Sequence, residues 1–223
     1  MCSTRRQRVK ITTVLFDLDG TLADTAPDLA LALAAMRKTG LPDLSYAAVR
    51  KATAAGTEAL LRLGLDIEPG TPDYETARLA FLGHYERLIG QATILTPGMA
   101  EVLQTLRAHA LPWGVVTNKT EVLAQRVLKV LSLDAEAACL VGGDTVTRPK
   151  PHPDPLLYAC ERIGVAPAAC VYVGDDQNDI LAAHAAGMPG FAAVFGYTSL
   201  AEARTWGADA LLSTPDDLLA ALL

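Results

Sequence analysis

The 223-residue sequence has few cysteines, no excess of basic residues and no long apolar run. Its four cysteines show neither CxxC spacing nor a dense framework, which argues against a disulfide scaffold or a zinc site. No uncharged stretch approaches the roughly 20 apolar residues that span a bilayer. A net charge of −6 disfavours nucleic acid as a partner. We therefore expect no membrane and no nucleic-acid partner.

The start of the chain carries a short basic run over residues 5–8. The apolar stretch Ile11–Phe16 follows and ends at Asp17, without the small-residue cleavage site of a secretory signal. The basic run is interpreted as a solvated tail, and the cysteines as reduced, buried apolar side chains. These patterns predict a cytoplasmic protein, and we expect a monomer or a homodimer.

Short apolar strands alternate with helical stretches over most of the chain. The expected strands are Ile11–Phe16, Trp113–Thr117, Cys139–Val141, Cys170–Val173, Phe191–Phe195 and Ala210–Leu212. The expected helices are Gly98–His109, Glu121–Leu131, Pro155–Ile163, Asn178–Ala186 and Pro215–Leu222. This alternation predicts an α/β fold with a doubly wound parallel sheet, that is, a Rossmann-like core.

The alternation stops between residues 26 and 95, where apolar residues repeat at helical spacing only. Pro27 and Pro97 lie near the two ends of this segment and interrupt both patterns. We therefore expect residues 26–95 to form an inserted helical cap domain. Residues 1–25 and 96–223 are then the α/β catalytic core.

Polar residues follow the expected strands at their carboxyl ends, where open parallel sheets bind their ligands. They are Asp17-Leu18-Asp19-Gly20-Thr21, Thr117-Asn118, Lys150, and Gly174-Asp175-Asp176 with Asp179 one helical turn further on. Turn and capping chemistry accounts for each piece taken alone. Unrelated capping residues would rarely fall at four strand ends of one sheet. This edge is thus predicted to be the functional site.

The acidic residues at this edge indicate a divalent cation. Asp17 and Asp19 lie two residues apart as the chain leaves a buried strand, so both carboxylates can face one crevice. Asp175, together with Asp176 or Asp179, adds carboxylate oxygen at the same edge. An all-oxygen cluster without Cys or His suits magnesium rather than zinc.

The remaining polar residues of this edge suit a phosphoryl group. Thr117 offers a hydroxyl and Lys150 a point charge, and both complement the negative oxygens of phosphoryl transfer. Carboxylates, a cation and these donors together predict phosphoryl transfer.

Four motifs resemble those of the haloacid dehalogenase superfamily. They are Val14-Leu15-Phe16-Asp17-Leu18-Asp19-Gly20-Thr21-Leu22-Ala23-Asp24-Thr25, Val115-Val116-Thr117-Asn118-Lys119, Lys150-Pro151-His152-Pro153 and Val173-Gly174-Asp175-Asp176-Gln177-Asn178-Asp179. The resemblance implies that Asp17 is the nucleophile and that Asp19 is the general acid and base. It also implies that Thr117, Lys150 and the backbone of Asn118 hold the phosphoryl group.

The same resemblance implies Mg²⁺ as the cofactor. Asp17, Asp19 and Asp175 would belong to the metal site, with Asp179 as the additional acidic partner because of its usual family spacing. Asp176 stays open as the alternative to Asp179.

A narrower resemblance concerns the substrate, which we expect to be a small phosphate monoester. Gly142-Gly143-Asp144 ahead of the Lys150 motif is similar to phosphoglycolate phosphatases, which favours 2-phosphoglycolate. The stretch 113–119, Gly196-Tyr197 and the stretch 206–209 resemble N-acetylmuramic acid 6-phosphate phosphatases, so that sugar phosphate is the alternative. Residues 54–57 depart from the glycine-richer cap loop usual in these enzymes.

Other classes of protein fit the motif order less well. Signalling receivers place the phosphorylated Asp after the third strand and lack a cap, and a non-catalytic binding protein has no reason to keep the whole set. The 2-haloacid dehalogenases lack a second Asp at the position of Asp19 and need no metal. A β-phosphoglucomutase-like phosphomutase shares both aspartates and stays open.

Overall fold

The computed structural model describes residues 10–37 and 44–223, so the basic run at residues 5–8 lies outside the described part. The central sheet has six strands in the order β5-β4-β1-β6-β7-β8, and every neighbouring pair is parallel. The strands are β1 Thr13–Phe16, β4 Trp113–Val116, β5 Leu140–Val141, β6 Cys170–Gly174, β7 Gly190–Ala193 and β8 Ala210–Leu212. The chain winds outward from β1 in both directions, which confirms the predicted α/β fold.

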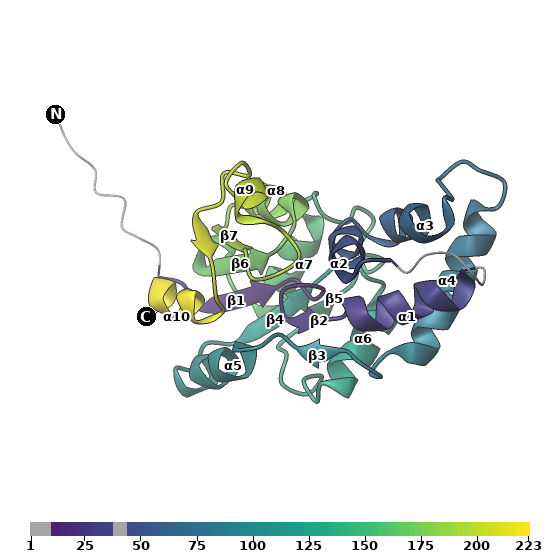
Figure 1. Cartoon of the computed structure of the whole chain (residues 1–223). Coiled ribbons are helices and arrows are strands. Elements are labelled where there is room, and N and C mark those ends of the chain that lie inside the picture. The colour runs from purple at the N-terminus through teal and green to yellow at the C-terminus, as the bar shows by residue number, and fades with distance from the viewer. Residues whose placement is uncertain (1–9, 38–43) are drawn as a thin grey trace.

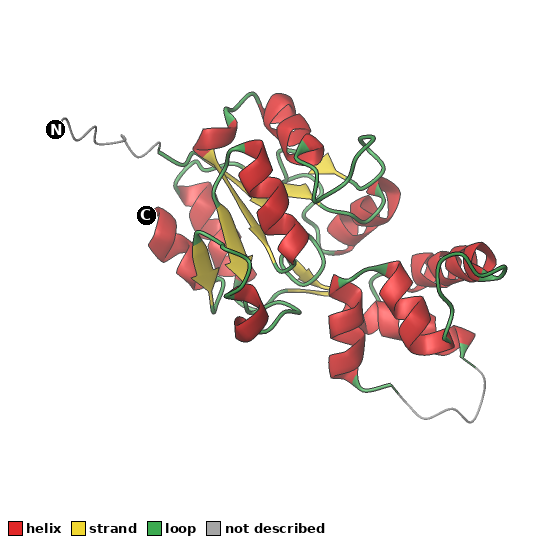
Figure 2. Ribbon diagram, turned by 90° about the horizontal axis from the view of Figure 1, so that it is seen from above, coloured by secondary structure: helices red, strands yellow, loops and turns green. Residues whose placement is uncertain are grey.

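Helices cover both faces of this sheet (Figure 2). They are α5 Met99–Ala108, α6 Glu121–Val130, α7 Asp154–Ile163, α8 Gln177–Ala186, α9 Leu200–Ala203 and α10 Asp216–Leu222, with the short 3₁₀ turn η1 Pro167–Ala169. Val14 and Phe16 of β1 pack in one core cluster with residues of α5 and α6, whereas Leu15 packs in another with residues of α7 and α8. Successive strand side chains point to opposite faces, so β1 is buried on both sides.

Four further helices form the segment that we call the cap segment, residues 26–95. They are α1 Ala26–Met36, α2 Tyr46–Ala54, α3 Thr57–Leu65 and α4 Tyr74–Leu88, and they lie together at one side of the sheet (Figure 1). Leu33, Leu61 and Phe81 are buried in their own apolar cluster, which also takes in Leu123 of α6. The exact domain boundaries stay a prediction.

The two crossings between the core and the cap segment form a small antiparallel ribbon of β2 Ala23–Asp24 and β3 Ile94–Leu95. The expectation of helical structure alone up to residue 95 was therefore wrong, because two-residue strands are too short to show a period. The fully buried Asp28 carboxylate accepts hydrogen bonds from the backbone N–H groups of Gly90 and Ala92, each at 2.7 Å. Asp28 thus fixes the start of α1 to the returning chain.

The described cysteines, Cys139, Cys160 and Cys170, are free and buried, as expected for small apolar side chains. Among the described helices, none combines the length and the apolar character that crossing a membrane requires.

Candidate active site

The carboxyl edge of the sheet and the cap segment enclose a pocket of about 310 Å³. Its core wall holds every residue to which the sequence analysis gives a candidate catalytic, phosphate-binding or metal-binding role. These are Asp17, Asp19, Thr117, Asn118, Lys150, Asp175, Asp176 and Asp179. Parallel pairing explains this convergence, because β1, β4, β5 and β6 all end at the same edge.

Three buried carboxylates lie together in this wall, with oxygens of Asp17, Asp175 and Asp179 all within 4.8 Å of one another. Burial raises the pKa of Asp17 to about 6 even though Lys150 opposes the shift. Burial, followed by repulsion from Asp17 and Asp179, raises the pKa of Asp175 well above its ordinary value. An all-oxygen group with this excess of negative charge fits a divalent cation.

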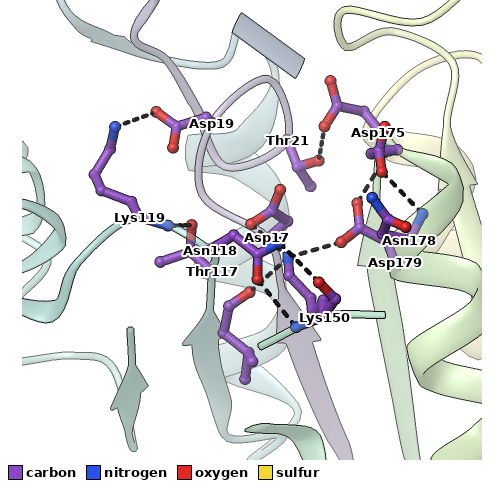
Figure 3. Close-up of polar contacts among 12 residues, drawn as sticks. Asp17, Asp19, Thr21, Thr117, Asn118, Lys119, Lys150, Asp175, Asn178 and Asp179 are labelled. Atoms are coloured by element: carbon purple, nitrogen blue, oxygen red, sulfur yellow. Dashed lines mark hydrogen bonds and ion pairs between the residues drawn. The ribbon is translucent and has the colours of Figure 1, made fainter. Parts of the chain in front are cut away.

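Lys150 supplies the positive charge beside these carboxylates (Figure 3). Its Nζ lies 2.9 Å from Asp17 Oδ1 and 2.7 Å from Asp179 Oδ1, and it donates to the Tyr172 hydroxyl at 2.7 Å. Burial disfavours the charged ammonium, but Asp17 and Asp179 outweigh burial and raise the pKa of Lys150. Lys150 therefore remains a cation beside the Asp17 carboxylate.

Asp176 and Asp179 have different positions, which bears on the alternative left open by the sequence. The Asp176 side chain accepts the Asn178 N–H at 2.8 Å and caps α8. Asp179 is buried, and its Oδ2 accepts the Asp176 N–H at 3.0 Å. A Cβ on Gly174 would lie 2.2 Å from Asp179 Oδ2, so the strand end needs glycine here. The geometry favours Asp179 as the acidic partner.

The loop after β1 closes around Asp175. Thr21 Oγ1 donates to Asp175 Oδ1 at 3.3 Å, and the Tyr197 N–H donates to Oδ2 at 2.7 Å. Gly20 has a φ of 78°, and a Cβ there would lie 2.2 Å from Asp175 Oδ2. The Gly20-Thr21 pair of the first motif thus brings the loop into contact with the Asp175 carboxylate, which directly follows β6.

Asp19 lies at the pocket but outside the group of three carboxylates. Its Oδ1 is 3.0 Å from Lys119 Nζ and accepts a hydrogen bond from Thr25 Oγ1, and Figure 3 shows it directed toward Lys119. Burial disfavours the Lys119 cation, but Asp19 outweighs burial and raises the pKa of Lys119. The side-chain geometry gives no support to Asp19 as a carboxylate metal ligand, and its acid–base role stays a prediction.

Thr117 and Asn118 follow β4 and have different tasks. The Asn118 side chain donates to the Lys150 carbonyl at 3.0 Å and accepts the Lys150 N–H at 3.1 Å. This reciprocal pair fixes the Lys150 backbone, so the backbone of Asn118, rather than its side chain, suits the predicted phosphate contact. Thr117 is buried, and its hydroxyl accepts the Lys119 N–H at 3.2 Å.

Four residues of the site were missed at the sequence level. Tyr172 donates to the Val116 carbonyl at 2.6 Å beneath Lys150, and Tyr197 contacts Asp175. Lys119 pairs with Asp19, and its Nζ lies 4.6 Å from the ring centroid of the buried Tyr85. The adjacency of Lys119 to Thr117-Asn118 was a usable signal. Tyr197 belonged to a motif that resembles N-acetylmuramic acid 6-phosphate phosphatases, but it was not assigned to the site. Tyr172 and Tyr85 gave no signal, since they resemble ordinary core residues.

Comparison with known proteins agrees with this geometry. The family of haloacid dehalogenase-like hydrolases matches residues 11–187. The chain belongs to this family. The predicted superfamily and hydrolase class are thereby confirmed.

Relatives of this haloacid dehalogenase-like hydrolase match it over nearly the full length. A phosphoglycolate phosphatase of Xanthomonas campestris is 45% identical, with 92% of this chain and 93% of the relative covered. An N-acetylmuramic acid 6-phosphate phosphatase of Pseudomonas putida is 36% identical, with 94% and 95% covered. The crystal structure of a predicted phosphoglycolate phosphatase from Haemophilus somnus has a TM-score of 0.82 at 29% identity, with 96% and 98% covered.

Proposed function

We propose that this haloacid dehalogenase-like hydrolase is a magnesium-dependent phosphatase that hydrolyses 2-phosphoglycolate. The observation that carries this proposal is the position of Asp17, held beside Lys150 within a group of buried carboxylates at the end of β1. The phosphoglycolate phosphatase relative at 45% identity supports the substrate.

The residues of the pocket suit a two-step transfer through an aspartyl phosphate. A carboxylate oxygen of Asp17 bonds to phosphorus as the bond from phosphorus to the ester oxygen breaks, and Asp19 gives that oxygen a proton. Water then attacks the phosphorus of the aspartyl phosphate, loses a proton to Asp19 and releases inorganic phosphate and free Asp17. Lys150 and Thr117 hold the negative phosphoryl oxygens during both steps.

Asp17 and Asp175, with Asp179 beside them, fit Mg²⁺ by their oxygen chemistry and their unbalanced charge. When bound, the ion neutralises charge on the phosphoryl oxygens. Lys150 lies between Asp17 and Asp179, and its ion pair with Asp17 orients the attacking carboxylate.

A second candidate substrate is N-acetylmuramic acid 6-phosphate, which the relative at 36% identity favours. A phosphomutase activity would need a sugar hydroxyl in place of water as the acceptor. The cytoplasmic location and the monomeric or homodimeric state are part of the same proposal.

A panel of phosphate esters assayed with Mg²⁺ tests the proposal. It contains 2-phosphoglycolate, N-acetylmuramic acid 6-phosphate, glucose 1-phosphate and a phosphopeptide, and inorganic phosphate is measured. We expect 2-phosphoglycolate to have the highest kcat/KM. A higher value for any other ester, or isomerisation of glucose 1-phosphate without phosphate release, contradicts it.

A further inference from the structure

The wall of the pocket that the cap segment provides carries one sign of charge. Among its described residues, Arg78 of α4 is the only charged side chain that lines the pocket. The opposite wall is the core wall with the candidate catalytic residues, which we call the catalytic wall. It holds Lys119 and Lys150, but Asp19 pairs with Lys119, and Asp17 and Asp179 pair with Lys150. Arg78 is therefore the cation of this pocket that no acidic group of the catalytic wall neutralises.

The Arg78 guanidinium is largely available to a ligand. Its Nε lies 3.0 Å from Glu75 Oε2, and its terminal nitrogens form no hydrogen bond or ion pair with the described residues. The Glu75 side chain is 67% exposed, and such surface pairs contribute little stability. A planar guanidinium with free terminal nitrogens suits a carboxylate in a bidentate pair.

Other parts of the pocket lining provided by the cap segment favour a polar ligand. Gly56 and Thr57 line the pocket at the start of α3, where no side chain caps the helix and the first N–H groups carry partial positive charge. Tyr85 also lines the pocket, and its buried hydroxyl has no hydrogen-bond partner in the described part of the chain. A buried hydroxyl of this kind is an independent sign of a polar ligand.

Spacing along α4 orders these groups. Arg78, Leu82 and Tyr85 are separated by four and three residues, so they share one face of the helix, and all three line the pocket. Tyr85 lies beside Lys119 and thus near the catalytic wall, whereas Arg78 lies about 10 Å further along the helix axis. Along this face of α4, the end of the pocket proposed to bind the phosphate is therefore followed by the apolar side chain of Leu82 and then by the cation of Arg78.

We propose that Arg78, assisted by the first turn of α3, binds a carboxylate at the end of the substrate remote from the phosphate. The inference rests on the proposed phosphatase function and names the substrate class as phosphate monoesters that carry a carboxylate. Both candidate substrates have one, in the glycolate or in the lactyl group. Arg78 determines specificity and takes no part in the transfer itself.

Two matched pairs of esters test this assignment. The first pair is 2-phosphoglycolate and 2-hydroxyethyl phosphate, and the second is N-acetylmuramic acid 6-phosphate and N-acetylglucosamine 6-phosphate; only the first member of each carries a carboxylate. For Arg78→Gln we expect kcat/KM for the preferred carboxylate ester to fall about 10- to 100-fold, the loss of one charge-assisted bond. The neutral partner should change less than about threefold, and Arg78→Lys should recover part of the loss.

Arg87→Gln is the control, because Arg87 lies on the same helix and contacts half-buried His84 outside the pocket. It should leave all four values unchanged. An equal loss for both members of a pair in Arg78→Gln, or no loss, overturns the role of Arg78 while the phosphatase proposal stands. If the wild-type protein hydrolyses neither carboxylate ester, the proposed function itself fails. The ester that shows the dependence on Arg78 identifies whether the glycolate or the lactyl carboxylate is bound.

Discussion

Lys150 holds the buried acidic residues of the catalytic wall in position. It forms ion pairs with Asp17 and Asp179 and donates a hydrogen bond to the Tyr172 hydroxyl. Burial would otherwise drive these carboxyl groups to bind protons. Even with Lys150 present, burial raises the pKa of Asp17 to about 6. Folding therefore buries carboxyl groups where their charged form is disfavoured, at the position where the reaction needs a nucleophile and a cation.

This raised pKa predicts a pH-dependent stability. The folded Asp17 holds a proton that the unfolded chain, with a pKa of 3.8, releases, so its contribution to stability is present below about pH 4 and is lost as the pH rises through 6. Asp17→Asn cannot titrate. Relative to the wild type, the free energy of unfolding of this variant should rise by roughly 3 kcal/mol between pH 4 and pH 7. Urea unfolding in chelator measures the difference, and a value independent of pH contradicts the expectation.

The position of Asp19 beside Lys119 predicts a leaving-group effect. For Asp19→Asn we expect kcat on 2-phosphoglycolate to fall roughly 10²–10⁴-fold, the scale of general acid–base catalysis. An activated ester such as p-nitrophenyl phosphate needs no proton on its leaving group, so phosphorylation of the enzyme should be affected less. Burst kinetics with both esters separate the two steps. Equal loss in the first step for both would argue against an acid role.

Among the elements, the loop after β7 joins the core to the cap segment through Tyr197. The Tyr197 hydroxyl accepts the N–H groups of Thr25 and Ala26 at 2.9 and 3.0 Å, which satisfies the start of α1. Arg50 of α2 lies 5.0 Å from the Tyr197 ring centroid and donates to the Gly196 carbonyl at 3.0 Å. The same loop thus contacts Asp175, the start of α1 and, through Arg50, α2 of the cap segment.

We expect Arg50→Ala to loosen the contact of α2 with this loop. Hydrogen exchange should rise in α2 and in residues 196–199, and KM should increase several-fold with a smaller change in kcat, because the catalytic wall is untouched. Lys51→Ala is the matched control, since it removes an exposed pair with Glu202 at 2.9 Å that contributes little. Similar exchange in the two variants would show that Arg50 has no special role.

The strands of the core and its helices other than α9 were predictable to within about two residues, because apolar periodicity is local. The four-residue α9 was not predicted, since it is too short to show a helical period. The β2–β3 ribbon was not, since each strand has only two residues. The orientation of the Asp19 side chain was also not predictable from the sequence, because it depends on Lys119, which follows another strand. Arg78 was not singled out from the sequence, because only the packing of α4 over the pocket brings it to the site.

The whole molecule places a group of buried carboxylates under a cap, so cation binding should couple to folding. An ion that binds only the native chain stabilises it by about 2.7 kcal/mol at 100 times its Kd. We therefore expect Mg²⁺ to raise Tm of the wild type and not of Asp175→Asn. Asp176→Asn is the control: an Asn side chain at this position can still cap α8, so this variant should start from a Tm close to that of the wild type and keep the shift. Thermal unfolding with and without Mg²⁺ measures the shift in Tm for each protein. Equal shifts in all three proteins would contradict the assigned site.

The central claim is that Asp17 carries the phosphoryl group during turnover. The direct measurement is acid quenching of the protein while it hydrolyses ³²P-labelled 2-phosphoglycolate with Mg²⁺, followed by identification of the labelled peptide. We expect transient label on the peptide that contains Asp17, and neither label nor phosphate release in Asp17→Asn. Label on another residue, or a near wild-type rate in Asp17→Asn, would contradict it.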